Sequence, residues 1–218
     1  MKRVALIHTG FALVDVLAEL FKEIIPEAEL INIVDDSLLR EVLKEGGLVQ
    51  PVLKRMLHYY KAAELYNVDC IFNVCSSVGE AADKARRQIE TPVVKIDEQM
   101  AQEAVKRAVN IGVAATLKTT LDPTCRLIEK KAKETGKGIK IEKTLCPGAF
   151  EELMNGNSEK HDGIVLKGIK ELAGKVDVVV LAQGSMARLV KSLDYDLASR
   201  VLSSPRSGIM EVKRVLGL

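Results

Sequence analysis

A cysteine lies where an apolar strand pattern ends and a helical pattern begins, in the stretch NVCSSVGEAADKA. Cys75 directly follows DCIFNV, and Ser76 and Ser77 lead into the predicted helix GEAADKARRQIE. Unpaired backbone N–H groups at the start of a helix favour a thiolate, so we expect a thiol pKa below about 8.5. The alternative is a small residue packed at the end of a strand. The stretch therefore predicts either a working thiol beside two substrate-binding serines or a packing cysteine.

A turn of the same kind occurs in the second half of the chain, in the stretch LAQGSMARL. Gln183, Gly184 and Ser185 follow an apolar strand pattern, and a helical pattern begins after them. Backbone N–H groups and the Ser185 hydroxyl at such a turn can hold a substrate carboxylate. An N-capping serine beside a glycine turn is the alternative.

The stretch ATLKTTLDPT combines hydroxyl groups with a cation at the end of another predicted strand. Thr116, Lys118 and Thr119 are candidates to bind an acidic substrate. Helix capping by threonine beside a solvated lysine is the alternative.

Two further residues are candidates for the same site. Arg206, in the stretch SSPRSG before the last predicted helix, either binds an anion or is a surface arginine. His8 ends the first predicted strand and is either a polar group of the site or a structural histidine.

Composition excludes several classes of protein. The chain has 218 residues, 47% of them hydrophobic, which suffices for one large domain or two small ones that share an interface. Its formal charge is +2, the basic residues are spread along the chain, and it has no Trp and only four Phe and four Tyr, so we expect no nucleic-acid partner. No H-x-x-x-H, carboxylate cluster or phosphate-binding loop predicts a metal or nucleoside triphosphate site.

The first 21 residues, MKRVALIHTGFALVDVLAELF, differ from a signal peptide. His8, Gly10 and Asp15 interrupt the apolar run, and no small-residue cleavage site follows, so we expect a first strand and helix of a cytoplasmic protein without a membrane partner. The four cysteines have neither metal-type spacing nor the density of a disulfide scaffold, and we expect them to be reduced.

Short apolar runs alternate with longer amphipathic segments along the whole chain. The predicted strands are residues 4–8, 29–33, 69–74, 92–96, 110–116, 138–142, 176–182 and, less clearly, 199–204. Continuous apolar strands separated by helices indicate βαβ units and mainly parallel sheets. The fold class predicted is therefore α/β.

The second half repeats the plan of the first. In each half a strongly apolar strand begins after Asp69 or Asp177 and ends in a turn of small residues before a helix. We therefore expect two similar three-layer α/β lobes related by a pseudo-twofold, residues 1–108 and 109–218. The final helix either stays with the second lobe or packs back on the first.

Ligands of such sheets bind beyond the carboxyl ends of the strands. Two facing lobes place Cys75 and Gln183 across one cleft, so we expect an active site between the lobes. We also expect residues 145–162, whose sequence LCPGAFEELMNGNSEKHD is rich in turn residues, to form a mobile loop that covers the cleft.

The two α/β halves and the turns NVCSSVGE, ATLKTT and LAQGSM together resemble the aspartate/glutamate/hydantoin racemase superfamily over nearly the whole chain. The resemblance implies an enzyme without a cofactor, a homodimer or higher homo-oligomer, and one cysteine from each half. One thiolate removes the proton next to a carboxylate or carbonyl, and the other thiol delivers a proton to the opposite face. The first cysteine of this pattern corresponds to Cys75.

The second cysteine of the pattern is absent. Hydantoin racemases have Leu-Gly-Cys-Ala-Gly-Met where this chain has Leu-Ala-Gln-Gly-Ser-Met, which puts Gln183 in the place of the thiol. An amide cannot exchange protons as a thiol does near neutral pH, so we expect one-sided chemistry. The superfamily also resembles arylmalonate decarboxylases and maleate isomerases, which have one cysteine or altered ones.

The combined expectation is a racemase-like or isomerase-like enzyme that uses Cys75 as acid, base or nucleophile on a small carboxylate or carbonyl metabolite. A lyase or decarboxylase with one cysteine is the second hypothesis. A small-acid-binding protein without catalysis is the third.

Overall fold

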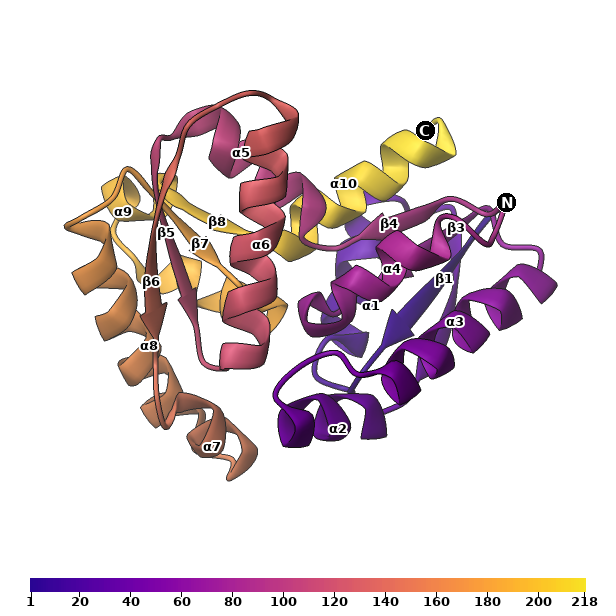
Figure 1. The fold of residues 1–218 in the computed structure, drawn as a ribbon, viewed down its shortest axis with the longest axis horizontal. Coiled ribbons are helices and arrows are strands. Elements are labelled where there is room, and N and C mark those ends of the chain that lie inside the picture. Colours follow the sequence, from indigo (N-terminus) through magenta and orange to yellow (C-terminus); the bar gives the residue numbers. More distant parts are fainter. The chain divides into compact units, whose positions relative to one another are not determined.

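The computed structural model describes residues 1–218 and divides the chain into two compact units, drawn as ribbons in Figure 1. Unit 1 comprises Met1–Gln99 and Pro205–Leu218, and unit 2 comprises Met100–Ser204. The sequence suggested a boundary near residue 108, whereas the contacts divide the chain after Gln99 and again after Ser204. The last helix belongs to unit 1.

Unit 1 is built on a four-stranded parallel sheet of order β2-β1-β3-β4. Its strands are β1 (Lys2–His8), β2 (Ala28–Val34), β3 (Cys70–Asn73) and β4 (Val93–Lys95). Its helices are α1 (Val14–Ile24), α2 (Ser37–Glu45), α3 (Gln50–Leu65), α4 (Gly79–Ala85) and α10 (Ser204–Leu216), with a short 3₁₀ turn, η1 (Ser76–Val78), before α4.

Helices cover both faces of this sheet because its strands alternate between two apolar cores. Ile7 and Ile71 pack with α2, α3 and α4 on one face, whereas Leu6 and Phe72 pack with α1 and α10 on the other. All four residues of β3 are buried, as expected of a central parallel strand.

Unit 2 repeats the arrangement with the strand order β6-β5-β7-β8. Its strands are β5 (Asn110–Ala115), β6 (Lys140–Leu145), β7 (Val178–Leu181) and β8 (Val201–Ser203). Its helices are α5 (Glu98–Arg107), α6 (Lys118–Glu134), α7 (Ala149–Met154), α8 (Ser158–Ala173) and α9 (Tyr195–Ser199), with a 3₁₀ helix, η2 (Gly184–Ser192), after β7. Because both sheets have the same strand order, the predicted repetition of the halves is confirmed.

All eight predicted strands are present, and two other predictions are wrong in detail. The helix expected over residues 79–90 ends at Ala85, where the Arg86 Nε turns to donate to the Val93 carbonyl at 2.9 Å. The mobile loop expected over residues 145–162 instead contains α7 and the first turn of α8. Gly148, the N-cap of α7, has a φ of 78°, which suits glycine.

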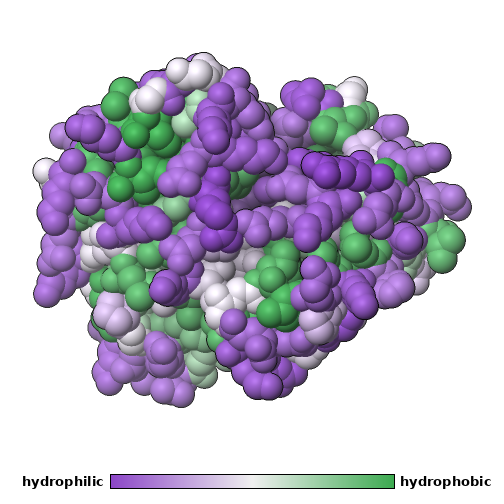
Figure 2. All heavy atoms as spheres, in the orientation of Figure 1, coloured by the Kyte–Doolittle hydropathy of each residue, from purple (hydrophilic) through white to green (hydrophobic).

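Hydrophilic residues cover much of the face drawn in Figure 2, and hydrophobic residues form separate patches on it. None of the helices is both long enough and apolar enough to cross a membrane.

Replacing Gly208 by alanine should destabilise unit 1. A Cβ at this position in α10 lies 2.7 Å from the Ile96 carbonyl oxygen and 3.0 Å from the Phe72 ring, so the helix has to move away from the sheet. We expect Gly208→Ala to lower the free energy of unfolding by about 1–3 kcal/mol in urea titrations followed by circular dichroism.

Gly163 is the matched control because it lies inside α8 with nothing within 4 Å of its added Cβ. Gly163→Ala gains helix propensity without a clash and should raise stability by up to about 1 kcal/mol. Equal effects of the two substitutions would contradict the close approach of α10 to the sheet.

Candidate active site

The Cys75 thiol lies at the carboxyl edge of the unit 1 sheet, two residues beyond the end of β3. Its backbone is extended, with φ −130° and ψ 117°, and η1 begins at the next residue. The Thr9 and Ser77 hydroxyls and the backbone N–H groups of Ser77 and Val78 donate hydrogen bonds toward the Cys75 sulfur. The predicted thiol among helix-start donors is therefore present.

The electrostatic consequence differs from the sequence-based expectation. Burial favours the neutral thiol and raises the pKa of Cys75, although the four donors around the sulfur oppose this effect. The expected pKa below the ordinary value is wrong, because the pattern revealed the donors but not the packing around the sulfur. The thiol is therefore largely protonated at neutral pH, and the four donors stabilise the thiolate when it forms.

Thr9 is a candidate site residue that was not predicted from the sequence. It follows β1, is 6% exposed, and places its hydroxyl against the Cys75 sulfur because β1 and β3 are neighbours in the sheet. The available signal was its position, since it is the first residue beyond a buried strand at the edge where ligands bind.

Gln183 holds the corresponding position in unit 2, two residues beyond the end of β7 and directly before η2. Its Oε1 accepts a hydrogen bond from the Thr116 backbone N–H at 2.7 Å, and its Nε2 donates to the Thr116 Oγ1 at 2.6 Å. Thr116 thus pairs with Gln183 as Thr9 pairs with Cys75. The amide is held by its own unit and supplies no titrating group.

The last backbone bonds of the central strands show that the two positions correspond. Val74 N donates to the Ile7 carbonyl at 3.2 Å, and Ala182 N donates to the Ala114 carbonyl at 3.0 Å. Cys75 and Gln183 each come one residue after these donors. The alignment of the two turns proposed from the sequence therefore has a structural counterpart in each sheet.

Six of the remaining predicted residues lie at the carboxyl edge of their own units. Ser76 and Ser77 are buried in η1, whereas Gly184 and Ser185 begin η2 and are partly exposed. In the first turn of α6, Lys118 is exposed and Thr119 is buried with no hydrogen-bond partner for its Oγ1.

His8 does not contact the thiol within the sheet. By strand alternation it shares the face of Leu6, whereas Cys75 packs on the face of Ile7. His8 is 1% exposed, its Nε2 lies 2.8 Å from the Asn32 Oδ1, and its Nδ1 has no partner. These features fit the structural alternative for this histidine.

Arg206, in the first turn of α10, is exposed and already paired with a carboxylate. Its guanidinium pairs with both carboxylate oxygens of Glu23 at 2.6 and 2.7 Å. Glu23 lies in the last turn of α1. The structure favours the alternative of a surface arginine.

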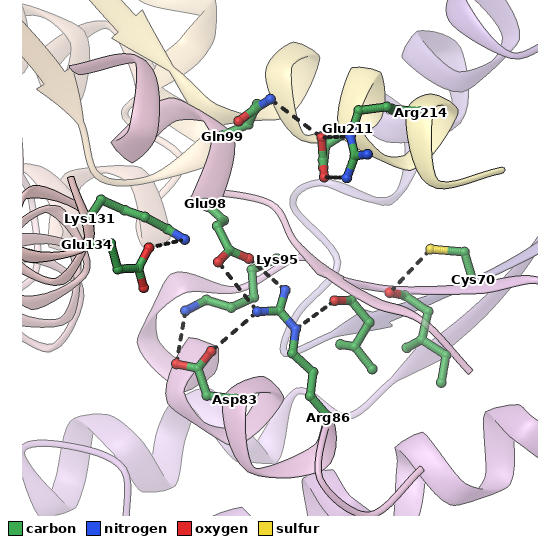
Figure 3. Close-up of polar contacts among 12 residues, drawn as sticks. Cys70, Asp83, Arg86, Lys95, Glu98, Gln99, Lys131, Glu134, Glu211 and Arg214 are labelled. Atoms are coloured by element: carbon green, nitrogen blue, oxygen red, sulfur yellow. Dashed lines mark hydrogen bonds and ion pairs between the residues drawn. The ribbon is translucent and has the colours of Figure 1, made fainter. Parts of the chain in front are cut away.

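A buried charged group beside η1 was not anticipated from the sequence. Figure 3 shows its lysine, Lys95, beside Asp83. Lys95 and Asp97, at the end of β4, are 3% and 2% exposed, and the Lys95 Nζ lies 3.4 Å from the Asp83 carboxylate. The Ser76 hydroxyl donates to Asp97, whose pKa is raised by burial. Gly79 leaves room for the lysine, because an added Cβ lies 3.3 Å from the Lys95 Cε.

The signal for this group was the change from apolar to charged residues in VVKIDE, at the edge that also carries Cys75. No three side chains of His, Cys, Asp or Glu lie together where they could hold a metal ion.

We predict that His8 contributes to acid sensitivity. Burial lowers the pKa of His8, so the neutral form stabilises the fold above the unfolded-state pKa of about 6.5, and this contribution is lost as the pH falls below it. The midpoint of thermal unfolding should fall between pH 7.5 and pH 5 by more in the wild type than in His8→Leu. Parallel pH profiles, measured by circular dichroism, would contradict this role.

Cys75 should react with iodoacetamide faster than Cys70, since Cys70 is fully buried and burial raises its pKa to about 12. Only the thiolate reacts, so the Cys75 rate should rise about tenfold per pH unit and level off above pH 8.5, because its pKa is raised. Mass spectrometry of quenched samples measures both sites. A plateau reached below pH 8 would contradict the raised pKa.

Comparison with known proteins finds one matching family and several solved structures with a similar fold. The model of the Asp/Glu/Hydantoin racemase family matches residues 5–212, and no curated protein sequence matches the chain. The chain resembles a glutamate racemase from Bacillus anthracis, with 17% identity over 99% of this chain and 82% of that one and a TM-score of 0.71.

Two other structures show the same fold. An aspartate racemase from Picrophilus torridus has 13% identity over 100% of this chain and 95% of that one, with a TM-score of 0.72. An allantoin racemase from Klebsiella pneumoniae has 18% identity over 100% of this chain and 89% of that one, with a TM-score of 0.67. With two parallel sheets of one strand order and a family match over nearly its whole length, the chain belongs to the Asp/Glu/hydantoin racemase family.

Proposed function

We propose that this protein is a racemase-like or isomerase-like enzyme that needs no cofactor and acts at the carbon next to a carboxylate or carbonyl of a small acid. Cys75 is its acid and base. The supporting observation is the hydrogen-bonded surroundings of the sulfur, in which two backbone N–H groups and two hydroxyls point toward Cys75. Family membership supports the reaction class, and the similar racemases of glutamate, aspartate and allantoin support a small substrate.

In the proposed reaction the thiolate takes the proton from the substrate carbon, and the electron pair of that C–H bond moves into the adjacent carboxylate or carbonyl as an enolate. The thiol, or water that exchanges with it, then returns a proton to the carbon. The donors around the sulfur lower the cost of forming the thiolate. No other protein group is needed for exchange on one face.

Gln183 decides what the reaction can achieve on the opposite face. Both polar atoms of its side chain are bonded to Thr116, and an amide does not exchange protons near neutral pH. That Gln183 shares the substrate with Cys75 stays a prediction. If it does, protonation from the Cys75 side alone also suits a decarboxylase or lyase with one cysteine, which is the second candidate.

Ser76 and Ser77 on unit 1, and Thr116, Lys118, Thr119, Gly184 and Ser185 on unit 2, are the proposed substrate-binding residues. Lys118 is exposed and able to meet an anionic group. The absence of a cofactor, the cytoplasmic location and the homodimer or higher homo-oligomer stay predictions.

Exchange of hydrogen for deuterium tests the proposal directly. The protein is incubated in deuterated water with a panel of small amino, hydroxy and dicarboxylic acids, and proton magnetic resonance follows the signal at the carbon next to the carboxylate. We expect exchange of at least one acid and a loss of about 10²–10⁴-fold in Cys75→Ala, since this substitution removes the general base.

Cys125→Ala is the matched control, because it removes another thiol by the same substitution, and Cys125 belongs to α6 of unit 2 and is buried in its apolar core. It should retain exchange, and circular dichroism should show both variants folded. Turnover by Cys75→Ala at the wild-type rate would sink the proposal. Thermal stabilisation by an acid whose hydrogen is never exchanged would favour the hypothesis of a binding protein without catalysis. A ligand at a hundred times its Kd raises the free energy of unfolding by about 2.7 kcal/mol.

A second arm of the experiment restores the missing thiol. Gln183→Cys should convert exchange on one face into racemisation, detected by chiral chromatography of the recovered acid. Exchange that proceeds in this variant without any inversion would contradict a shared substrate.

A further inference from the structure

A polar chain buried in unit 1 leads from α3 to the backbone of the thiol residue. Tyr60 and Asn73 are both 0% exposed. The Tyr60 hydroxyl donates to the Asn73 Oδ1 at 3.1 Å, and the Asn73 Nδ2 donates to the Cys75 carbonyl oxygen at 3.1 Å. Asn73 is the last residue of β3 and faces an otherwise apolar cluster.

The two hydrogen bonds of this polar chain can run in only one direction. A backbone carbonyl accepts hydrogen bonds and cannot donate, so the Asn73 amide must turn its Nδ2 toward Cys75 and its Oδ1 toward Tyr60. Burial and the neighbouring Cys75 both raise the pKa of Tyr60, so its hydroxyl stays a donor. The phenol therefore fixes the amide, and the amide fixes the carbonyl.

The fold itself does not require a polar residue at this point. In unit 2 the corresponding last residue of β7 is Leu181, which pairs with Ala114 as Asn73 pairs with Ile7. Leu181 is fully buried in an apolar cluster. A buried amide left unpaired is destabilising, so an asparagine at this position needs hydrogen-bond partners. The polar chain occurs in the unit that carries the thiol.

The carbonyl that Asn73 holds is also the start of η1. Val78 N donates to it at 3.3 Å, and the same N–H points toward the Cys75 sulfur. The Asn73 amide also donates to this carbonyl. The carbonyl therefore keeps a donor when the Val78 N–H is shared with the thiolate. Movement of the carbonyl changes the distance from Cys75 to two of its donors, the N–H groups of Ser77 and Val78.

We propose that Asn73, oriented by Tyr60, is a positioning residue that sets the Cys75 thiol against the N–H groups of η1. Its effect on turnover rests on the proposed function, whereas its effect on the thiol does not. Neither residue touches the substrate carbon in this proposal. Both act through the backbone of Cys75.

The rate of Cys75 labelling by iodoacetamide between pH 6.5 and pH 10 tests the proposal without a substrate. Asn73→Leu installs the residue that unit 2 uses and should raise the thiol pKa by about one unit, which slows labelling about tenfold below pH 8. Tyr60→Phe should produce a smaller shift in the same direction. The labelling profile of the double variant should match that of Asn73→Leu, since Tyr60 acts on Cys75 only through Asn73.

Ile71→Val is the matched control, because Ile71 lies on the same strand and face and has no bond to Cys75. It should loosen the core and leave the labelling profile unchanged. A wild-type profile in Asn73→Leu would overturn the proposal and leave Asn73 as a structural brace. If Asn73→Leu does not fold, the profile of Tyr60→Phe decides in the same way.

Turnover adds a second readout once an exchanged acid is known. We expect kcat to fall in Asn73→Leu with KM nearly unchanged, since the substrate-binding groups are untouched. A changed KM with an unchanged kcat would overturn positioning of the thiol. If no acid is exchanged by the wild type, the proposed function fails, and the labelling profiles still decide the role of Asn73.

Discussion

Val74 and Ala182 donate the last backbone hydrogen bonds between the central strands of their sheets, and the positions of the site residues depend on these bonds. They fix the register in which the residue beyond β1 lies beside Cys75 and the residue beyond β5 lies beside Gln183. A slip of one residue would turn Cys75 to the opposite face of the sheet. The apolar cores on both faces oppose such a slip, because it would exchange the strand residues that pack in one core with those that pack in the other.

The two units use one framework for different chemistry. Each has a threonine after its central strand, and each threonine contacts the side chain two residues beyond the neighbouring strand. In unit 1 that side chain is a thiol, and Asn73 bonds the backbone carbonyl of the same residue. In unit 2 it is an amide that satisfies both of its polar atoms locally. The geometry is repeated, whereas the capacity to move a proton is not.

Apolar runs and turn residues were sufficient to predict the strands and the place of Cys75, because both depend on local pattern. Side-chain partners depend on which elements pack together, and one sequence does not reveal them. The pKa of Cys75 and the ion pair of Arg206 with Glu23 were missed for this reason. Thr9 and Asp97 could have been suspected from their places after buried strands. Their contacts with Cys75 and Ser76 required the structure.

The return of α10 to unit 1 has a consequence for biosynthesis. Unit 2 is continuous in the chain, whereas unit 1 needs residues 205–218, which the ribosome makes after all of unit 2. Until α10 emerges, Phe72 and Ile96 lack the helix that packs closest to them at Gly208. Domains tend to fold as their chains emerge, so the unit begun first is here the unit completed last. A nascent chain therefore carries an unfinished apolar face through the synthesis of its second half, which is a natural contact for a chaperone.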